Sequence, residues 1–248
     1  MIKEKRKRKR RIALFFRAFL ITMLVIATAI LIILKVFTVE NIQIEGNKLY
    51  DQKIIEDVVL NDEYSWNSLY VYIKYRFVDT QDVPFIDTMD ISLSDPHTLK
   101  IKVYEKGMMG YLYIPGINEN AYFDKDGIIV ETSSDVIDRV PKIEGIDCEK
   151  VVLYEKLPIK TSKLRDILTL TQALKRKKLV PDSIIYGGVN EPELKYKKVS
   201  VFVGDISLLT QKVDRLEAIM PSIKDMNGTL HLESWTEENT NIVFDKNN

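Results

Sequence analysis

The longest pattern in the chain is a nearly unbroken hydrophobic run over residues 12–34, interrupted only by Arg17. As a helix with a rise of about 1.5 Å per residue, this run spans about 34 Å, enough for a hydrocarbon core about 30 Å thick. A buried globular helix or the apolar region of a signal peptide would also be hydrophobic. However, the run exceeds the ~7–15 residues usual for a signal peptide, and Lys35 follows it instead of small residues. We therefore predict an uncleaved transmembrane helix over 12–34.

Short patterns after this run predict a small α+β domain. Alternation of apolar and polar residues indicates strands, and apolar residues at three- and four-residue spacing indicate a helix. In order along the chain these are a strand over 39–45, a helix over 51–60 with Asp51 as its N-cap, and a hairpin over 89–105 that turns at Asp95–His97. A sheet covered on one face by helices fits this order.

The segment Leu69–Val78 fits two structures equally well. Leu69, Tyr72, Ile73 and Phe77 form a helical stripe, but every second residue from Leu69 also forms a strand face. Periodicity leaves helix and strand both open. The aromatic and basic residues here also resemble a nucleic-acid platform, but packing in a core is the simpler interpretation for a segment outside a membrane.

Beyond residue 106 the pattern is mostly β, with two amphipathic helices. The helices are expected over 164–177 and 208–220, the second ended by Pro221. Alternation over 229–233 predicts a last strand, and the polar segment 234–248 is expected to be a flexible tail. The predicted fold class is thus α+β, a single transmembrane helix followed by a small α+β domain and a mostly β domain with two helices.

Charge divides the chain unevenly and sets an orientation. Residues 1–11 carry eight basic side chains and one acidic side chain, Glu4, so this tail has a net charge of +7 although the whole chain of 248 residues is neutral. Basic flanks remain in the cytoplasm, which places the later domains outside. Anionic lipid is the expected partner of this tail, and nucleic acid is not, because the charge directly adjoins an apolar span.

Residues with catalytic or metal-binding chemistry are sparse. His97, His231 and the single cysteine, Cys148, cannot supply a zinc site of usual ligand count, and no nucleophile elbow, zinc-protease or phosphate-loop motif occurs. Asp124 and Asp126 are typical of a hairpin turn, since no distal acidic ligand for calcium follows. We expect no catalytic residues, no cofactor and no metal.

One segment after the hydrophobic run has a familiar sequence. Val39–Asn47, which reads VENIQIEGN, resembles the opening of a POTRA domain in the FtsQ/DivIB family of bacterial cell-division proteins. The resemblance continues in the family's order through Pro84, Leu99–Lys106, Phe123–Gly127, Val140–Gly145 and Lys212–Leu216. The chain departs from the family at Tyr64–Asn67, where many members have a glycine, and matches it only loosely over 146–200.

The resemblance implies a non-enzymatic component of the division machinery at the septum. Such a protein recruits or regulates septal peptidoglycan synthesis. It binds the extracytoplasmic parts of FtsL and DivIC/FtsB, two coiled-coil division proteins, and other components of the divisome. The family places partner binding at a sheet edge that corresponds to Thr229, Leu230, His231, Leu232 and Glu233. A strand that only closes the fold is the other interpretation of these residues. An anchored POTRA module for secretion or assembly is the alternative function.

These observations predict a five-part organisation. Its parts are a cytoplasmic tail over 1–11, a transmembrane helix over 12–34, a POTRA domain over 38–106, a β domain over 107–233 and a flexible tail over 234–248.

Overall fold

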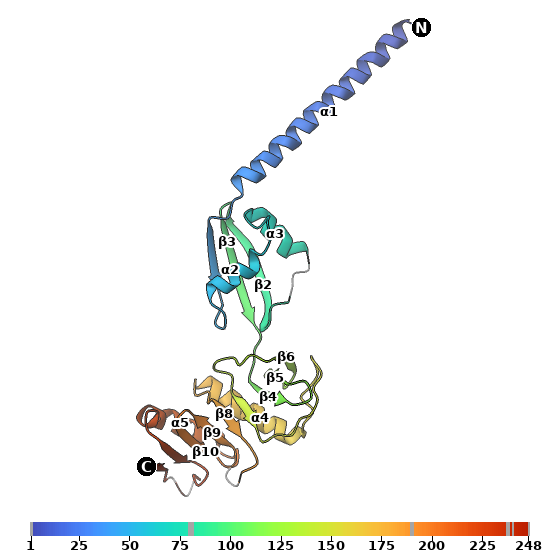
Figure 1. The fold of residues 1–248 in the computed structure, drawn as a ribbon. Coiled ribbons are helices and arrows are strands. Elements are labelled where there is room, and N and C mark those ends of the chain that lie inside the picture. Colours follow the sequence, from blue (N-terminus) through green and yellow to red (C-terminus); the bar gives the residue numbers. More distant parts are fainter. Residues whose placement is uncertain (1, 79–81, 189–190, 237–238, 240, 248) are drawn as a thin grey trace. The chain divides into compact units, whose positions relative to one another are not determined.

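The computed structural model describes residues 2–78, 82–188, 191–236, 239 and 241–247, with side chains from residue 11 onward. Within these residues the protein is a mixed α+β chain of five helices and twelve strands (Figure 1). It forms two compact units, Met1–Glu105 and Lys106–Asn248.

Helix α1, Ile2–Val36, contains the predicted span. Its segment Arg11–Val36 is long and apolar enough to cross a membrane, and none of that segment is buried by the rest of the protein. Its two threonines do not interrupt the apolar surface, because Thr22 Oγ1 donates to Ala18 O at 2.9 Å and Thr28 Oγ1 to Leu24 O at 2.8 Å.

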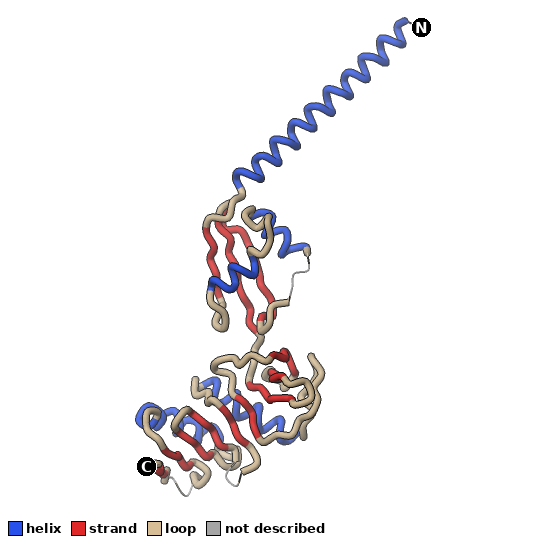
Figure 2. The backbone as a smooth tube through the Cα atoms, in the orientation of Figure 1, coloured by secondary structure: helices blue, strands red, loops and turns tan. Residues whose placement is uncertain are grey.

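The first unit contains a three-stranded sheet with the order β1-β3-β2. Strand β1 (Asn41–Glu45) runs parallel to β3 (Thr98–Glu105), and β2 (Ile86–Asp95) pairs antiparallel with β3 to form the predicted hairpin. Helices α2 (Gln52–Val59) and α3 (Ser68–Phe77) cover the sheet (Figures 1 and 2).

The segment 69–78, for which the sequence left helix and strand open, is therefore helical up to Phe77. Asn67 is the N-cap of α3, because its side-chain oxygen accepts a hydrogen bond from Tyr70 N at 2.9 Å. One face of α3 then buries Val71 against Leu99 and Ile101 of β3, together with Ile55 of α2. A single hydrophobic cluster thus joins both helices to one face of the sheet.

The second unit is built on a nine-stranded sheet with the order β12-β11-β10-β9-β8-β7-β4-β5-β6. Most neighbouring strands are antiparallel, but β4–β7, β7–β8 and β10–β11 are parallel. The strands are β4 Gly110–Ile114, β5 Glu119–Phe123, β6 Ile129–Ser133, β7 Lys142–Glu144, β8 Ser183–Ile185, β9 Glu193–Tyr196, β10 Val199–Phe202, β11 Gly228–His231 and β12 Val243–Lys246.

Helices make two of the three crossovers that these parallel strands require. Helix α4 (Thr161–Arg176) connects β7 to β8, and α5 (Leu209–Ile223) connects β10 to β11. Both helices contribute buried residues to the cluster that includes Ile184 and Val201 of the sheet, so they cover the same face (Figure 2).

Two predictions for this unit are wrong. Helix α5 continues through Pro221 to Ile223, because proline in the last turn removes one hydrogen bond, and Lys224 N still donates to Met220 O at 2.9 Å. The segment predicted as a flexible tail, 234–248, contains strand β12 and the indole of Trp235, which is only 5% exposed. The ordered second unit therefore extends beyond residue 233.

Candidate partner-binding site

The residues proposed from the sequence as a sheet edge lie inside the sheet. Strand β11 pairs in parallel with β10 on one side and antiparallel with β12 on the other. Leu230 and Leu232 are each 1% exposed and belong to the core, while Thr229, His231 and Glu233 alternate with them and are half-buried. The expectation that Thr229–Glu233 form an open edge is wrong, because the polar C-terminal segment supplies one more strand.

Strand β12 occupies the edge instead. Its register on β11 pairs His231 with Val243, Leu230 with Phe244 and Gly228 with Lys246. Beyond it, Asn247 N donates to Asn227 O at 3.0 Å. Hydrogen-bonded and non-hydrogen-bonded pairs alternate in an antiparallel ladder, so this bond places the backbone groups of Phe244 and Lys246 on the outer side.

Nothing in the described part of the chain pairs with that outer side of β12. Val243 is 50% exposed, and Asp245 and Lys246 are also exposed. Phe244 alone is half-buried and packs on the core cluster. The edge thus combines unpaired backbone groups with a short row of exposed side chains, which is the arrangement to which an added strand can bind.

Gly228 permits the close approach of β12. A β-carbon at this position would lie 2.3 Å from Asp245 O and 2.6 Å from the Phe244 ring, and both distances are shorter than van der Waals contact. Only glycine therefore lets the Phe244 ring lie over the start of β11 without a shift of the strand.

A histidine connects the two strands through its side chain. His231 Nδ1 lies 2.7 Å from Glu233 Oε1, and His231 Nε2 lies 3.3 Å from Asp245 Oδ2. The imidazole also packs against the Phe202 ring of β10, with 5.6 Å between ring centroids. These contacts add a polar tie between β11 and β12 on the sheet face opposite the buried leucines.

Lys212 of α5 supports the same end of the sheet from beneath. Its side chain is 2% exposed, and its ammonium group donates to Val203 O at 2.9 Å and to Asp205 O at 3.0 Å, which fixes the loop between β10 and α5. Burial lowers the pKa of Lys212 below its usual value. The loop is further ordered by Asp205, whose carboxylate accepts from Ser207 N at 2.7 Å.

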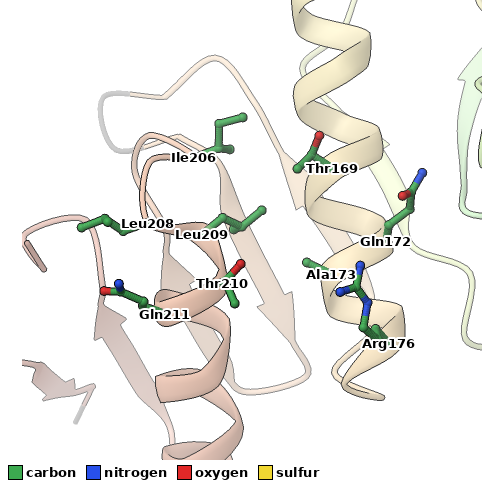
Figure 3. A pocket seen from close by; sticks show the side chains of 9 residues that line it. All are labelled: Thr169, Gln172, Ala173, Arg176, Ile206, Leu208, Leu209, Thr210 and Gln211. Carbon is green, nitrogen blue, oxygen red and sulfur yellow. The ribbon is translucent and has the colours of Figure 1, made fainter.

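An open hollow of about 460 Å³ lies between α4 and the start of α5 (Figure 3). The residues that line it are Thr169, Gln172, Ala173, Arg176, Ile206, Leu208, Leu209, Thr210 and Gln211. Arg176 is the only ionisable residue among them, so the hollow lacks the paired nucleophile and base that covalent or acid–base catalysis needs.

The potential metal ligands and the cysteine form no cluster in the residues that the structure describes. In the described residues, no three side chains of the His, Cys, Asp or Glu type are placed to hold a metal ion. Burial raises the pKa of the Cys148 thiol, which disfavours the reactive thiolate.

Sequence reasoning missed β12, although one signal was present. Ile242, Val243 and Phe244 are three consecutive apolar residues within an otherwise polar segment. No model of a known protein family matches the sequence, and no curated protein matches it either.

Proposed function

We propose that this protein is a membrane-anchored, non-enzymatic division protein of the FtsQ/DivIB type. In this proposal the first unit is a POTRA domain, and the second unit binds the extracytoplasmic segments of FtsL and DivIC/FtsB-type proteins. Through these contacts the protein recruits or regulates septal peptidoglycan synthesis.

The anchor proposal is supported by charge and hydrophobicity together. The +7 tail of residues 1–11 directly precedes the apolar surface of α1. Basic residues on one flank favour the cytoplasmic side, so the protein is proposed to cross the cell membrane once with both units outside. The tail then lies against anionic lipid of the inner leaflet.

The POTRA proposal is supported by the element order of the first unit. Strand β1 is followed by α2 and α3 and then by the β2–β3 hairpin, and β1 pairs in parallel with β3. The residue patterns predict this order over 39–105, the segment that begins with the residues resembling a POTRA domain.

The open edge of β12 is the observation that carries the binding proposal. The outward backbone groups of Phe244 and Lys246 offer two positions for hydrogen bonds to a partner strand. The proposed contact strand is therefore β12, and the residues Thr229–Glu233 hold β12 in place and do not meet the partner through their backbone.

Calorimetric titration tests this proposal directly. The full chain in lipid nanodiscs is titrated with the extracytoplasmic DivIC–FtsL pair, beside a chain that ends at Ile242 and so lacks β12. We expect binding by the full chain and none by the shortened chain, with circular dichroism to show that the shortened chain remains folded. Equal binding by both chains would contradict strand addition at β12.

A proline substitution sharpens this experiment. Lys246→Pro removes an N–H that faces the open side, whereas Lys246→Ser keeps that donor and removes the same charged side chain. We expect Lys246→Pro to weaken binding about tenfold, as loss of about 1.4 kcal/mol would, and Lys246→Ser to bind as the original chain does. If the full chain binds neither protein of the pair, an anchored POTRA module with another partner becomes the better description.

A further inference from the structure

The loop between α2 and α3, residues 60–67, is bonded to the end of the candidate membrane helix. Val39 N donates to Trp66 O at 2.8 Å, and Ser68 N donates to Phe37 O at 3.3 Å. In addition, the Asn67 amide donates to Ile33 O at 3.0 Å, inside the last turns of α1. These bonds place the loop where α1 leaves its apolar segment, Arg11–Val36.

Two aromatic side chains of this loop are exposed. Tyr64 is 55% exposed and Trp66 is 48% exposed, whereas Ser65 and Asn67 between and beside them are buried. The loop therefore directs its polar residues into the unit and its large rings outward. Amphipathic rings with this placement are enriched where a membrane meets water.

The loop is held rigidly in this conformation by Asp62. The Asp62 carboxylate accepts from Lys74 Nζ at 2.7 Å, Ser65 Oγ at 2.9 Å and Tyr64 N at 3.0 Å. The Tyr64 ring also packs edge-on against Tyr70, with centroids 5.7 Å apart. Little conformational entropy remains to be lost when these rings contact another surface.

The charged groups at this end of the unit do not favour binding to anionic lipid. Carboxylates of Glu40, Glu63 and Asp95 lie on the segments that meet here. The basic groups here include Lys35 in the last turn of α1, Lys74, which is paired with Asp62, and His97, whose Nδ1 lies 3.4 Å from Glu40 Oε1. Acidic groups oppose attraction to anionic headgroups. At this end of the unit the aromatic rings, and not the charged groups, are therefore suited to contact a membrane surface.

We propose that Tyr64 and Trp66 insert into the headgroup layer of the same membrane that α1 crosses and thereby fix the first unit against the bilayer. The ligand is the lipid–water interface itself, recognised by aromatic rings independently of lipid charge. This inference rests on the proposed membrane anchor.

Tryptophan emission can test the inference, because the chain has only two tryptophans, Trp66 and Trp235. The full chain carrying Trp235→Phe is reconstituted into phosphatidylcholine vesicles whose acyl chains are brominated near the headgroup. We expect Trp66 to lose roughly half of its emission relative to vesicles without bromine, since the interface is where indoles reside. The loss is expected to be the same at roughly 0.1 M and 1 M salt, because screening affects only charge contacts.

A matched probe at the other end of the same unit provides the control. Tyr104 is 43% exposed and lies six residues along β3 from Thr98, about 20 Å at ~3.3 Å per residue. The variant with Trp66→Phe, Trp235→Phe and Tyr104→Trp is expected to keep its emission in brominated vesicles.

Each outcome separates the inference from the anchor on which it rests. Retention of the chain in vesicles after an alkaline wash measures the anchor independently. If the chain is retained but Trp66 is quenched no more than the Tyr104→Trp probe, interfacial docking is overturned and the anchor stands. If quenching disappears at high salt, recognition by aromatic rings is overturned. If the chain is washed off, the anchor and the docking both fall.

Discussion

The two units differ in where the last strand of each sheet lies. In the first unit, the last strand, β3, lies at the centre of the sheet between β1 and its hairpin partner β2. In the second unit, β11 depends on a parallel pairing with β10 that forms only after α5 has crossed the sheet, and on β12 from the end of the chain. A substitution in β11 should therefore affect the whole second unit and leave the first unchanged.

The largest effect is expected from Leu230→Pro. Leu230 is 1% exposed, and the alternation that directs Thr229 toward β12 directs the Leu230 N–H toward β10. Loss of the packed side chain and of a ladder hydrogen bond should lower the free energy of unfolding of the second unit by about 3–5 kcal/mol.

Hydrogen exchange read by mass spectrometry in increasing urea measures both units in one sample. Lys246→Pro is the control, since its N–H faces the open side of β12 and its loss should leave the second unit stable. Equal destabilisation by Leu230→Pro and Lys246→Pro would contradict the placement of β11 inside the sheet and of β12 at its edge.

A smaller and more local effect is expected from Gly228→Val. The new side chain would overlap Asp245 O and the Phe244 ring, so β12 should detach while β11 stays paired with β10. We expect a loss of about 1–3 kcal/mol, the usual range for overpacking, with faster exchange confined to the amides of β12. Gly107→Ala is the matched control, because nothing lies within 4 Å of a β-carbon at that position. Unchanged exchange in β12 would disprove the role assigned to Gly228.

In the first unit, Asn67→Ala should destabilise the start of α3 by about 1 kcal/mol, the usual cost of losing an N-cap. The Asn67 oxygen accepts from Tyr70 N at 2.9 Å, and Asn67→Ser retains an acceptor there while losing the amide that donates to Ile33 O. Amide exchange in the first turn of α3 should therefore increase in the alanine variant only. If serine behaves like alanine, the bond to α1 and not the cap determines the stability of this turn.

The same contrast explains how much of the fold the sequence could predict. The hairpin over 89–105 and the helix over 51–60 follow from local alternation and spacing, and both are found in the first unit. The apolar residues Leu230 and Leu232, separated by a polar residue, correctly indicated a strand. However, an internal strand and an edge strand with one buried face show the same alternation of apolar and polar residues, so the pattern could not distinguish them.

Two strands escaped prediction for a physical reason. Strands β9 (Glu193–Tyr196) and β12 (Val243–Lys246) are only four residues long, so either could show at most two repeats of a period-two pattern. Their pairing is determined by distant strands, Ser183–Ile185 and Val199–Phe202 for β9 and Gly228–His231 for β12. The open edge of the sheet was consequently expected at β11 and is found one strand farther out, at β12.

The smallest expected effect concerns the pH dependence of the first unit. The hydrogen bond from Lys74, followed by those from Ser65 and Tyr64, outweighs the effect of burial and lowers the pKa of Asp62 from 3.8 to about 2. A carboxyl whose pKa is lower in the folded state binds fewer protons there than in the unfolded state between these two values. Its stabilising contribution is therefore complete above about pH 4 and is lost as the pH falls toward 2.

Asp62→Asn should remove this pH dependence from the first unit. Because the Lys74–Asp62 pair is partly exposed, the difference at neutral pH should stay within about 1 kcal/mol. Unfolding of the first unit, followed by hydrogen exchange between pH 2 and pH 5, should then show a smaller loss of stability in the variant than in the original chain, while the second unit titrates identically in both. A variant that loses stability on acidification as steeply as the original chain would show that other carboxylates, and not Asp62, control the acid sensitivity of this unit.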